Sequence, residues 1–242
     1  VAEDVLLTGK ADMVSFGRQS IADPEMPNKV AGGNLEEIAP CIACHQGCAG
    51  NIFDGKPLTC LVNPFAGKEG TRKMEPASKA KRIMVVGGGP GGLEAAWIMA
   101  KRGHQVSLYE KQGVLGGQFR IGAIAPGKGE LTAPIAYYRH MCEKYGAAIH
   151  LNTEVTAELV KAEKPDAVVL ATGGIPLVPD IPGIDNPKYV HAVDVLQGKV
   201  EVGKKVLIIG GGIVGIEVAD FLGQYGRRVT IVEMKNEIME DM

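Results

Sequence analysis

Four of the five cysteines lie close together near the start of the chain. Cys41, Cys44 and Cys48 form a tight run, and Cys60 follows after a longer gap. A short loop with three thiolates can bind three corners of a cubane [4Fe–4S] cluster, and a returning segment can supply the fourth sulfur. The spacing therefore favours an iron–sulfur cluster. Structural zinc, which usually takes two separated ligand pairs, is the main alternative, and free thiols are a second.

Two further residues carry groups that could do similar chemistry, but we expect neither to belong to this site. His45 stands inside the cysteine run, where it could ligate a metal only with a different loop conformation. The fifth cysteine, Cys142, falls on the apolar face of a helix predicted over residues 129–145. We therefore expect Cys142 to be a buried apolar residue rather than a redox thiol.

A glycine-rich turn follows the apolar segment 83–86. Gly87 allows a tight turn off a strand, Gly89 allows the backbone to approach a pyrophosphate, and Gly92 allows close packing of helix on strand. A helix over residues 91–101 and a strand over 106–109 should follow. The helix N-terminus favours an anion, and Glu110 after the second strand can accept hydrogen bonds from a ribose diol.

The same pattern recurs near the end of the sequence. Gly210, Gly212 and Gly215 follow another apolar segment, and Glu233 stands at the same interval from its first glycine as Glu110 does. A single glycine motif is weak evidence, because glycine turns also occur in sheets that bind no nucleotide. Two copies with one spacing favour two dinucleotide sites. The acid at Glu233 repels a 2′-phosphate, which favours NADH over NADPH.

A phosphate-binding loop is one interpretation of Gly17 and Arg18. They follow residues 12–16, which the pattern predicts to be a short strand, and a backbone N–H with a guanidinium at a strand end can hold phosphate. On these residues alone, an arginine in an ordinary loop between strand and helix is favoured.

Two other glycine loops could pass close to a ligand. One contains Gly117 and Gln118, and the other contains Gly173 after a strand predicted to be buried over residues 166–171. Such a strand end can place backbone beside a flavin nucleotide, and a simple turn is the alternative.

The overall composition excludes several classes of function. The net charge is −2 and aromatic residues are sparse, so no nucleic-acid surface is expected. No apolar run is long enough for a membrane span and no signal peptide opens the chain, so we expect a cytoplasmic setting. Because the chain begins at Val1 without Met and stops soon after Glu233, we expect it to be a segment of a longer protein.

Taken in order, the motifs resemble those of one enzyme family. The segments DMVSFGR, CIACHQGC with Cys60, VVGGGPGG, LGGQ, LATGG and LIIGGGIVG are similar to those of the iron–sulfur flavoenzymes related to 2,4-dienoyl-CoA reductase, trimethylamine dehydrogenase and enoate reductase. The resemblance implies an α/β chain that contains the end of a TIM barrel, a [4Fe–4S] loop, a Rossmann-like FAD domain and the start of a Rossmann-like NAD(P) domain. The implied boundaries are 1–40, 41–64, a linker over 65–80, 81–203 and 204–242.

The resemblance also implies a role for each motif. Gly17 and Arg18 would hold the FMN phosphate, and the four clustered cysteines would bind the [4Fe–4S] cluster. The residues implied around FAD, or around ADP in the dehydrogenase-like branch, are Gly87, Gly89, Gly92, Glu110, Gly117, Gln118 and Gly173. The residues implied around NADH are Gly210, Gly212, Gly215 and Glu233. The catalytic residues of the substrate site would lie outside this chain.

The function implied is an oxidoreductase that passes electrons from NADH through FAD and the cluster to FMN, for reduction of an activated C=C bond in a small molecule. The alternatives are an amine dehydrogenase that sends electrons outward and a non-catalytic electron-transfer module. A thioredoxin-reductase-like enzyme is disfavoured because the second glycine unit has no C-x-x-C. A glutamate-synthase-type subunit is disfavoured by the barrel-like DMVSFGR. The sequence leaves a homo-oligomer open.

Overall fold

A parallel sheet organises the middle of the chain in the computed structural model, which describes residues 1–240. The sheet has four strands in the order β3-β2-β1-β4, and every pair is parallel. The central strands β1 and β2 are the most buried, with Val85 and Leu108 completely inaccessible to solvent. The strands are β1 (Arg82–Val86), β2 (Gln105–Tyr109), β3 (Ala148–His150) and β4 (Ala167–Leu170).

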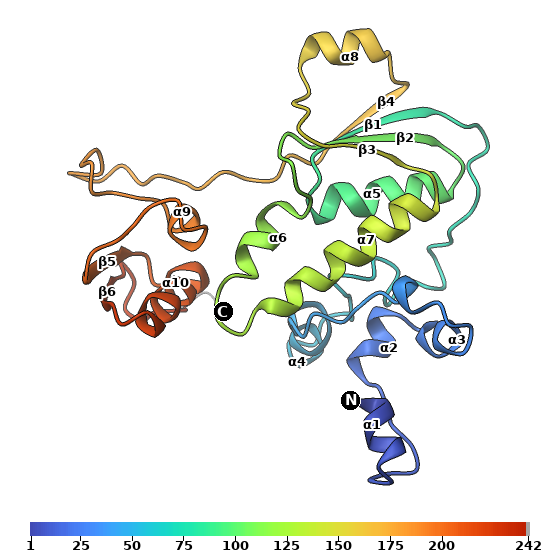
Figure 1. Cartoon of the computed structure of the whole chain (residues 1–242), viewed down its shortest axis with the longest axis horizontal. Coiled ribbons are helices and arrows are strands. Elements are labelled where there is room, and N and C mark those ends of the chain that lie inside the picture. The colour runs from blue at the N-terminus through green and yellow to red at the C-terminus, as the bar shows by residue number, and fades with distance from the viewer. Residues whose placement is uncertain (241–242) are drawn as a thin grey trace.

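Two helices, α5 (Pro90–Lys101) and α7 (Ala133–Lys144), lie side by side on one face of this sheet (Figure 1). Between them and the sheet lies the main core, to which α5 contributes Leu93 and Trp97 and α7 contributes Tyr138. These helices explain why β1 and β2 are apolar along their length. The shorter helices of this region are α6 (Gly117–Gly122), the 3₁₀ turn η3 (Gly129–Thr132) and α8 (Ala157–Glu163).

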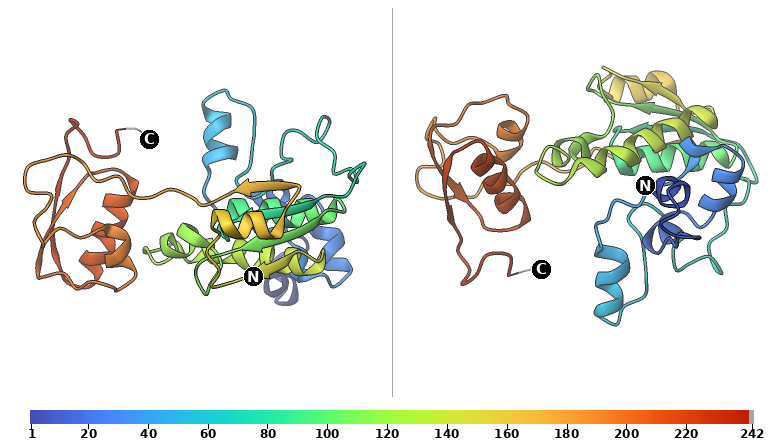
Figure 2. Two further views of the ribbon diagram at one scale, coloured as in Figure 1. Left: turned by 90° about the horizontal axis from the view of Figure 1, so that it is seen from above. Right: turned by 60° about the horizontal axis from the view of Figure 1, so that its bottom comes forward.

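The last part of the chain forms a second, smaller α/β unit, which an extended segment joins to the first (Figures 1 and 2). Its two strands are parallel, and its small core is built around Val195, Val218 and Leu222. The elements of this unit are α9 (Ala192–Leu196), β5 (Lys205–Ile209), α10 (Ile213–Gln224) and β6 (Arg228–Val232).

The N-terminal region consists of short helices and turns that pack against α7. An ion pair of 2.5 Å joins Glu37 to Lys144 of α7. Apolar residues of the cysteine-containing segment, among them Ile42 and Val62, belong to the main core. The elements are α1 (Ala2–Leu7), α2 (Arg18–Ala22), α3 (Met26–Ala31), the 3₁₀ turn η1 (Leu35–Glu37), the π-helical turn η2 (Gln46–Gly50) and α4 (Asn51–Phe53).

Most predicted elements are confirmed, but two predictions about strands are wrong. Residues 12–16 form no strand, and Met13 is 85% exposed. A strand needs a neighbour for its backbone N–H and C=O groups, and nothing within residues 1–240 pairs with this segment. The strand predicted to be buried is present as β4, but Leu170 is 78% exposed. Because β4 pairs only with β1, it is an edge strand.

Across residues 1–240, no helix is both long enough and apolar enough to cross a bilayer.

Candidate functional site

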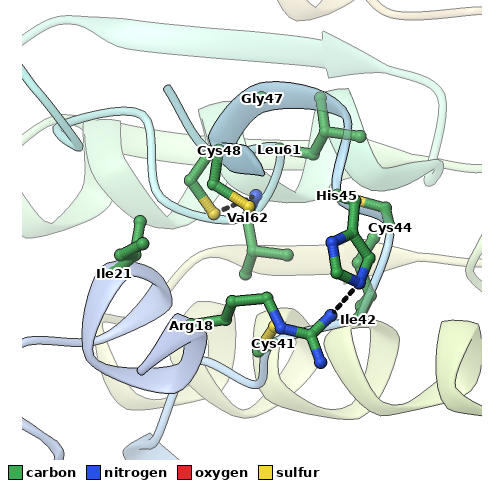
Figure 3. A pocket seen from close by; sticks show the side chains of 11 residues that line it. Arg18, Ile21, Cys41, Ile42, Cys44, His45, Gly47, Cys48, Leu61 and Val62 are labelled. Carbon is green, nitrogen blue, oxygen red and sulfur yellow. Dashed lines mark hydrogen bonds between the residues drawn. The ribbon is translucent and has the colours of Figure 1, made fainter. Parts of the chain in front are cut away.

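The four clustered cysteines line one pocket, which we call the cysteine pocket (Figure 3). Cys41 and Cys44 come from the irregular segment after η1, Cys48 from the turn η2, and Cys60 from the returning segment. The structure thus brings together cysteines that the sequence places up to nineteen positions apart. The other residues around the pocket are Arg18, Ile21, Ile42, His45, Gly47, Leu61 and Val62.

Backbone conformation turns the cysteine run around this pocket. Ala43 and His45 both adopt left-handed conformations, with φ of 53° and 58°, which are unusual for residues other than glycine. Gly47 packs so tightly that an added Cβ would lie 2.7 Å from Oγ1 of Thr59. The N–H of Thr59 also donates to the carbonyl of Gly47 over 2.7 Å. Gly47 therefore lets the returning segment bring Cys60 next to the run.

Side-chain hydrogen bonds to and from α2 hold the segments that carry Cys41 and Cys60. The N–H of Cys41 donates to Oε1 of Gln19 over 2.9 Å, and the amide of Gln19 donates to Ala39. Asn63 donates to the carbonyl of Ile21 over 2.9 Å. Sequence analysis missed Gln19 and Asn63, because an amide in a short helix or loop carries no signal of its distant partner.

The buried carboxylate of Asp23 also helps to hold the segment that carries Cys41. It accepts hydrogen bonds from the N–H of Ala39 over 2.8 Å and from Lys29 over 2.6 Å. Asp23 is only 3% exposed, so the two donors compensate for its removal from water. The segment leading to Cys41 is thereby attached to α2 and α3.

The cysteine pocket combines thiols with apolar walls and a few donors. The N–H of Val62 donates to the sulfur of Cys60 over 3.4 Å. The guanidinium of Arg18 donates to Nε2 of His45 (Figure 3). Arg18 therefore lies at the cysteine pocket, where it retains further N–H donors for an anion. Gly17 precedes α2 as its N-cap, and an added Cβ there would meet nothing within 4 Å.

The first glycine turn has the geometry that its spacing predicts. Gly87 adopts φ of +111°, and its N–H donates to Tyr109 across the strands over 2.8 Å. A Cβ added to Gly92 would lie 1.9 Å from the carbonyl oxygen of Gly87, so only glycine fits there. A Cβ added to Gly89 would meet nothing within 4 Å, which leaves open space at the N-terminus of α5. This is the place where a pyrophosphate would bind.

The acid after β2 closes this turn. Glu110 is 8% exposed, and its two oxygens accept hydrogen bonds from the N–H groups of Gly88 over 2.7 Å and Gln112 over 2.8 Å. A carboxylate has capacity for further donors, so these bonds leave the predicted ribose contact chemically open. That contact stays a prediction.

The two other glycine loops converge on the first turn. Gly117 follows Gly116, whose N–H donates to Gly88 over 2.8 Å, and a Cβ added to Gly117 would lie 3.3 Å from the Cα of Gly89. The side chain of Gln118 donates to the carbonyl of Gly174. Gly173, just before it, adopts φ of +74°. Residues predicted at one dinucleotide site thus surround the same turn.

The second glycine turn repeats this geometry. Gly210 adopts φ of +105°, and a Cβ added to Gly215 would lie 1.9 Å from the oxygen of Gly210. A Cβ added to Gly212 would meet nothing within 4 Å. Hydrogen bonds from Gly211 over 2.6 Å and Lys235 over 3.0 Å reach Glu233, and they hold the pKa of this carboxyl below its usual range. Glu233 is therefore an anion at neutral pH.

Cys142 is completely buried in the main core, as predicted. Burial raises the pKa of its thiol to about 12, and the nearby carboxylates of Glu94 and Glu143 add to the effect. A thiol with so high a pKa is a poor nucleophile and metal ligand. This separates Cys142 chemically from the cysteines of the pocket.

The fold and the two glycine turns define an α/β protein with two dinucleotide-binding units. Residues 81–242 match the sequence family described as pyridine nucleotide-disulphide oxidoreductase, and the chain belongs to this family. Similarity over its whole length also confirms the resemblance to the iron–sulfur flavoenzymes related to 2,4-dienoyl-CoA reductase and trimethylamine dehydrogenase.

Three relatives illustrate this similarity. The chain is 45% identical to an NADH oxidase of Thermoanaerobacter brockii, with 100% of the chain and 38% of the relative covered. It is 40% identical to a cinnamate reductase of Clostridium sporogenes, covering 99% of the chain and 36% of the relative. The solved structure of a 2-naphthoyl-CoA reductase complex matches with a TM-score of 0.96 and 40% identity, covering 99% of the chain and 37% of that protein. The chain therefore spans well under half the length of these relatives.

Proposed function

We propose that the chain is the electron-transfer part of an NADH-dependent iron–sulfur flavoprotein that reduces an activated C=C bond in a small molecule. The observation that carries this proposal is the cysteine pocket, whose residues pack directly against the core of the first dinucleotide unit. When bound, the cofactors would take hydride from NADH onto FAD, pass single electrons through a [4Fe–4S] cluster, and deliver them through FMN to the substrate.

The donor set of the cysteine pocket supports a cluster rather than zinc. Four thiols surround the pocket, three of them from one tight run and the fourth from the returning segment. In a cubane each cysteine binds a different iron, which this arrangement suits, whereas structural zinc usually takes two separated pairs of ligands. The apolar walls and the N–H directed at Cys60 would then tune its potential.

The two dinucleotide turns support the assignment of FAD and NADH. The first turn is surrounded by the loops of Gly117 and Gly173, which would cover a bound FAD. The second turn ends in the anionic Glu233, which favours NADH because it repels a 2′-phosphate. The name of the relative from T. brockii, an NADH oxidase, agrees with this preference.

The substrate class is supported by the names of two relatives. Cinnamate and 2-naphthoyl-CoA are both molecules in which carbon–carbon double bonds are conjugated to a carboxyl or thioester carbonyl. An enoate, an enoyl-CoA or an enone shares this activation. Gly17 and Arg18 would hold the phosphate of FMN, and the position of Arg18 at the cysteine pocket would bring that flavin close to the cluster.

The decisive experiment is cofactor analysis of the intact protein purified anaerobically. We expect four irons with matching sulfide, one FMN and one FAD per chain. Cys60→Ser should lose iron, whereas Cys142→Ser, which changes the buried thiol outside the pocket, should retain it. A protein that holds zinc instead of iron, or that contains no FMN, would contradict the proposal.

A further inference from the structure

A partly buried glutamate stands on α5, one of the two helices that cover the sheet. Glu94 belongs to α5, and its Oε2 accepts a hydrogen bond from Nε1 of Trp97 over 2.7 Å. Its Oε1 is inaccessible to solvent and has no hydrogen-bond partner. A buried carboxylate oxygen without a partner is unfavourable, so this site stabilises the carboxylate poorly.

Within the described residues, the titratable side chains of α7 that interact with Glu94 are Tyr137, Tyr138 and Cys142, none of which is a cation. Each has its pKa raised first by burial and then by the charge of Glu94. The strands beneath α5 add apolar side chains to the same core. The cation of Lys101 lies over the ring of Trp97, 5.8 Å from its centroid. Burial, opposed only by the Trp97 hydrogen bond, raises the pKa of Glu94 to about 7.

This core also reaches the cysteine pocket. Cys44 and Cys60 pack against the cluster of buried residues that contains Trp97 and Tyr138. Tyr138, only 3% exposed, lies within electrostatic reach of both Glu94 and Cys60. At its other end, α5 begins at the first glycine turn. Through its hydrogen bond with Trp97, Glu94 is joined to the core against which Cys44 and Cys60 pack.

The second unit provides a natural comparison. Glu217 occupies the same position in its motif, two residues after Gly215, as Glu94 does after Gly92. Its side chain is 26% exposed and forms an ion pair of 2.8 Å with Lys128. The same residue type in the same motif is thus compensated by a cation in one unit and left without one in the other.

We propose that Glu94 is a proton-binding site linked to the redox state of the cluster at the cysteine pocket. When the cluster gains one electron from the reduced flavin, the carboxylate of Glu94 binds one proton from water, and reoxidation releases that proton. The negative charge of the electron and that of the carboxylate repel each other across the core, which drives the uptake. This inference rests on the cluster of the proposed function and adds the group that balances its charge.

The test is a redox titration of the intact, anaerobically purified protein, with dithionite as reductant and the electron paramagnetic resonance of the reduced cluster as readout. We expect the cluster potential to become more negative as pH rises through about 7. A coupling of about one pKa unit corresponds to a tenfold change in the reduction equilibrium over this pH range. Glu94→Gln, which keeps an acceptor for Trp97, should make the potential independent of pH. Glu217→Gln should leave the pH dependence unchanged.

A second variant covers the case in which Glu94→Gln fails to fold. Trp97→Phe removes the hydrogen bond that lowers the pKa of Glu94, so the pH dependence should shift to higher pH. A potential that does not vary with pH in the wild type, or the same variation in Glu94→Gln, would overturn the inference while leaving the cluster in place. A protein without iron would overturn the proposed function itself, and this inference with it.

Discussion

The two dinucleotide units have almost the same turn and very different surroundings. In both, the first glycine has φ above +100°, the third would place a Cβ 1.9 Å from the first one's oxygen, and the terminal acid accepts the N–H that follows the first glycine. Yet Met84 in β1 is 2% exposed, whereas its counterpart Leu207 in β5 is 61% exposed. Within residues 1–240, β1 lies inside a four-stranded sheet and β5 pairs only with β6, so the same turn has different surroundings in the two units.

The charged residues of the two units also differ in burial. Glu110 is almost inaccessible after β2, whereas its counterpart Glu233 follows an exposed strand end. Glu94 is partly buried and its Oε1 has no hydrogen-bond partner, whereas its counterpart Glu217 pairs with Lys128. A repeated sequence motif therefore does not imply repeated electrostatics. Substitutions at matched positions can separate the effect of the motif from the effect of its surroundings.

The largest effect on stability should come from the third glycine of each turn. Gly92→Ala would force a Cβ against the oxygen of Gly87, so we expect it to lower the free energy of unfolding by about 3 kcal/mol. Gly215→Ala should destabilise the second unit by a similar amount, because its clash is the same. Urea denaturation would measure both.

The neighbouring Gly91→Ala is the matched control for this prediction. A Cβ at Gly91 would meet nothing within 4 Å, and alanine favours a helix, so stability should be unchanged or slightly higher. If Gly215→Ala proved harmless while Gly92→Ala did not, the equivalence of the two turns would be wrong.

The next largest effect is on the pH dependence of stability, which should differ between Glu94 and Glu217. The pKa of Glu94 rises from 4.5 in the unfolded chain to about 7 in the fold. The folded state therefore binds the proton more tightly, and stability falls as pH rises from about 4.5 to about 7. Glu94→Gln should thus gain about 2 kcal/mol over the wild type at pH 8 and little at pH 4.5. Urea unfolding at the two pH values measures this.

Glu217→Gln provides the comparison, since it removes a glutamate that has a cation beside it. Glu217→Gln should show no gain in the free energy of unfolding at pH 8. Equal pH profiles for the two variants would mean that burial does not distinguish the units at this position.

A smaller effect is expected at the acid of the second turn. Glu233→Arg should raise the ratio of kcat/KM for NADPH to that for NADH by roughly tenfold in the intact protein, because arginine attracts the 2′-phosphate that glutamate repels. Glu237→Arg, an exposed charge reversal four residues later, is the control and should leave the ratio unchanged. A wild type that already prefers NADPH would contradict the role given to Glu233.

Features that depend on nearby residues could be predicted from the sequence. The glycine turns, the helix after each turn and the burial of Cys142 follow from spacing and periodicity, and the structure confirms them. The run from Cys41 to Cys48 is likewise local, and its three cysteines share a pocket with Cys60.

Features that depend on distant partners could not be predicted. The segment 12–16 has a strand-like pattern but no strand to pair with among the described residues. The exposure of β4 depends on its place at the sheet edge. Gln19 reaches Cys41 and Asn63 reaches Ile21 through tertiary contacts alone. Glu94 and Glu217 stand at the same position of their motifs, two residues after Gly92 and Gly215, so only the fold shows which of them has a cation beside it.

The smallest effect should come from the ion pair between Lys128 and Glu217. Their side chains are 45% and 26% exposed, so water and salt weaken the attraction. A double-mutant cycle with Lys128→Ala and Glu217→Ala should give a coupling energy of about 0.5 kcal/mol or less, falling further at high salt. This pair would then compensate the charge of Glu217 without adding much stability, which is the contrast with Glu94. A coupling energy several times larger would mean that Glu217 is held as tightly as a buried group, and the electrostatic difference between the two units would disappear.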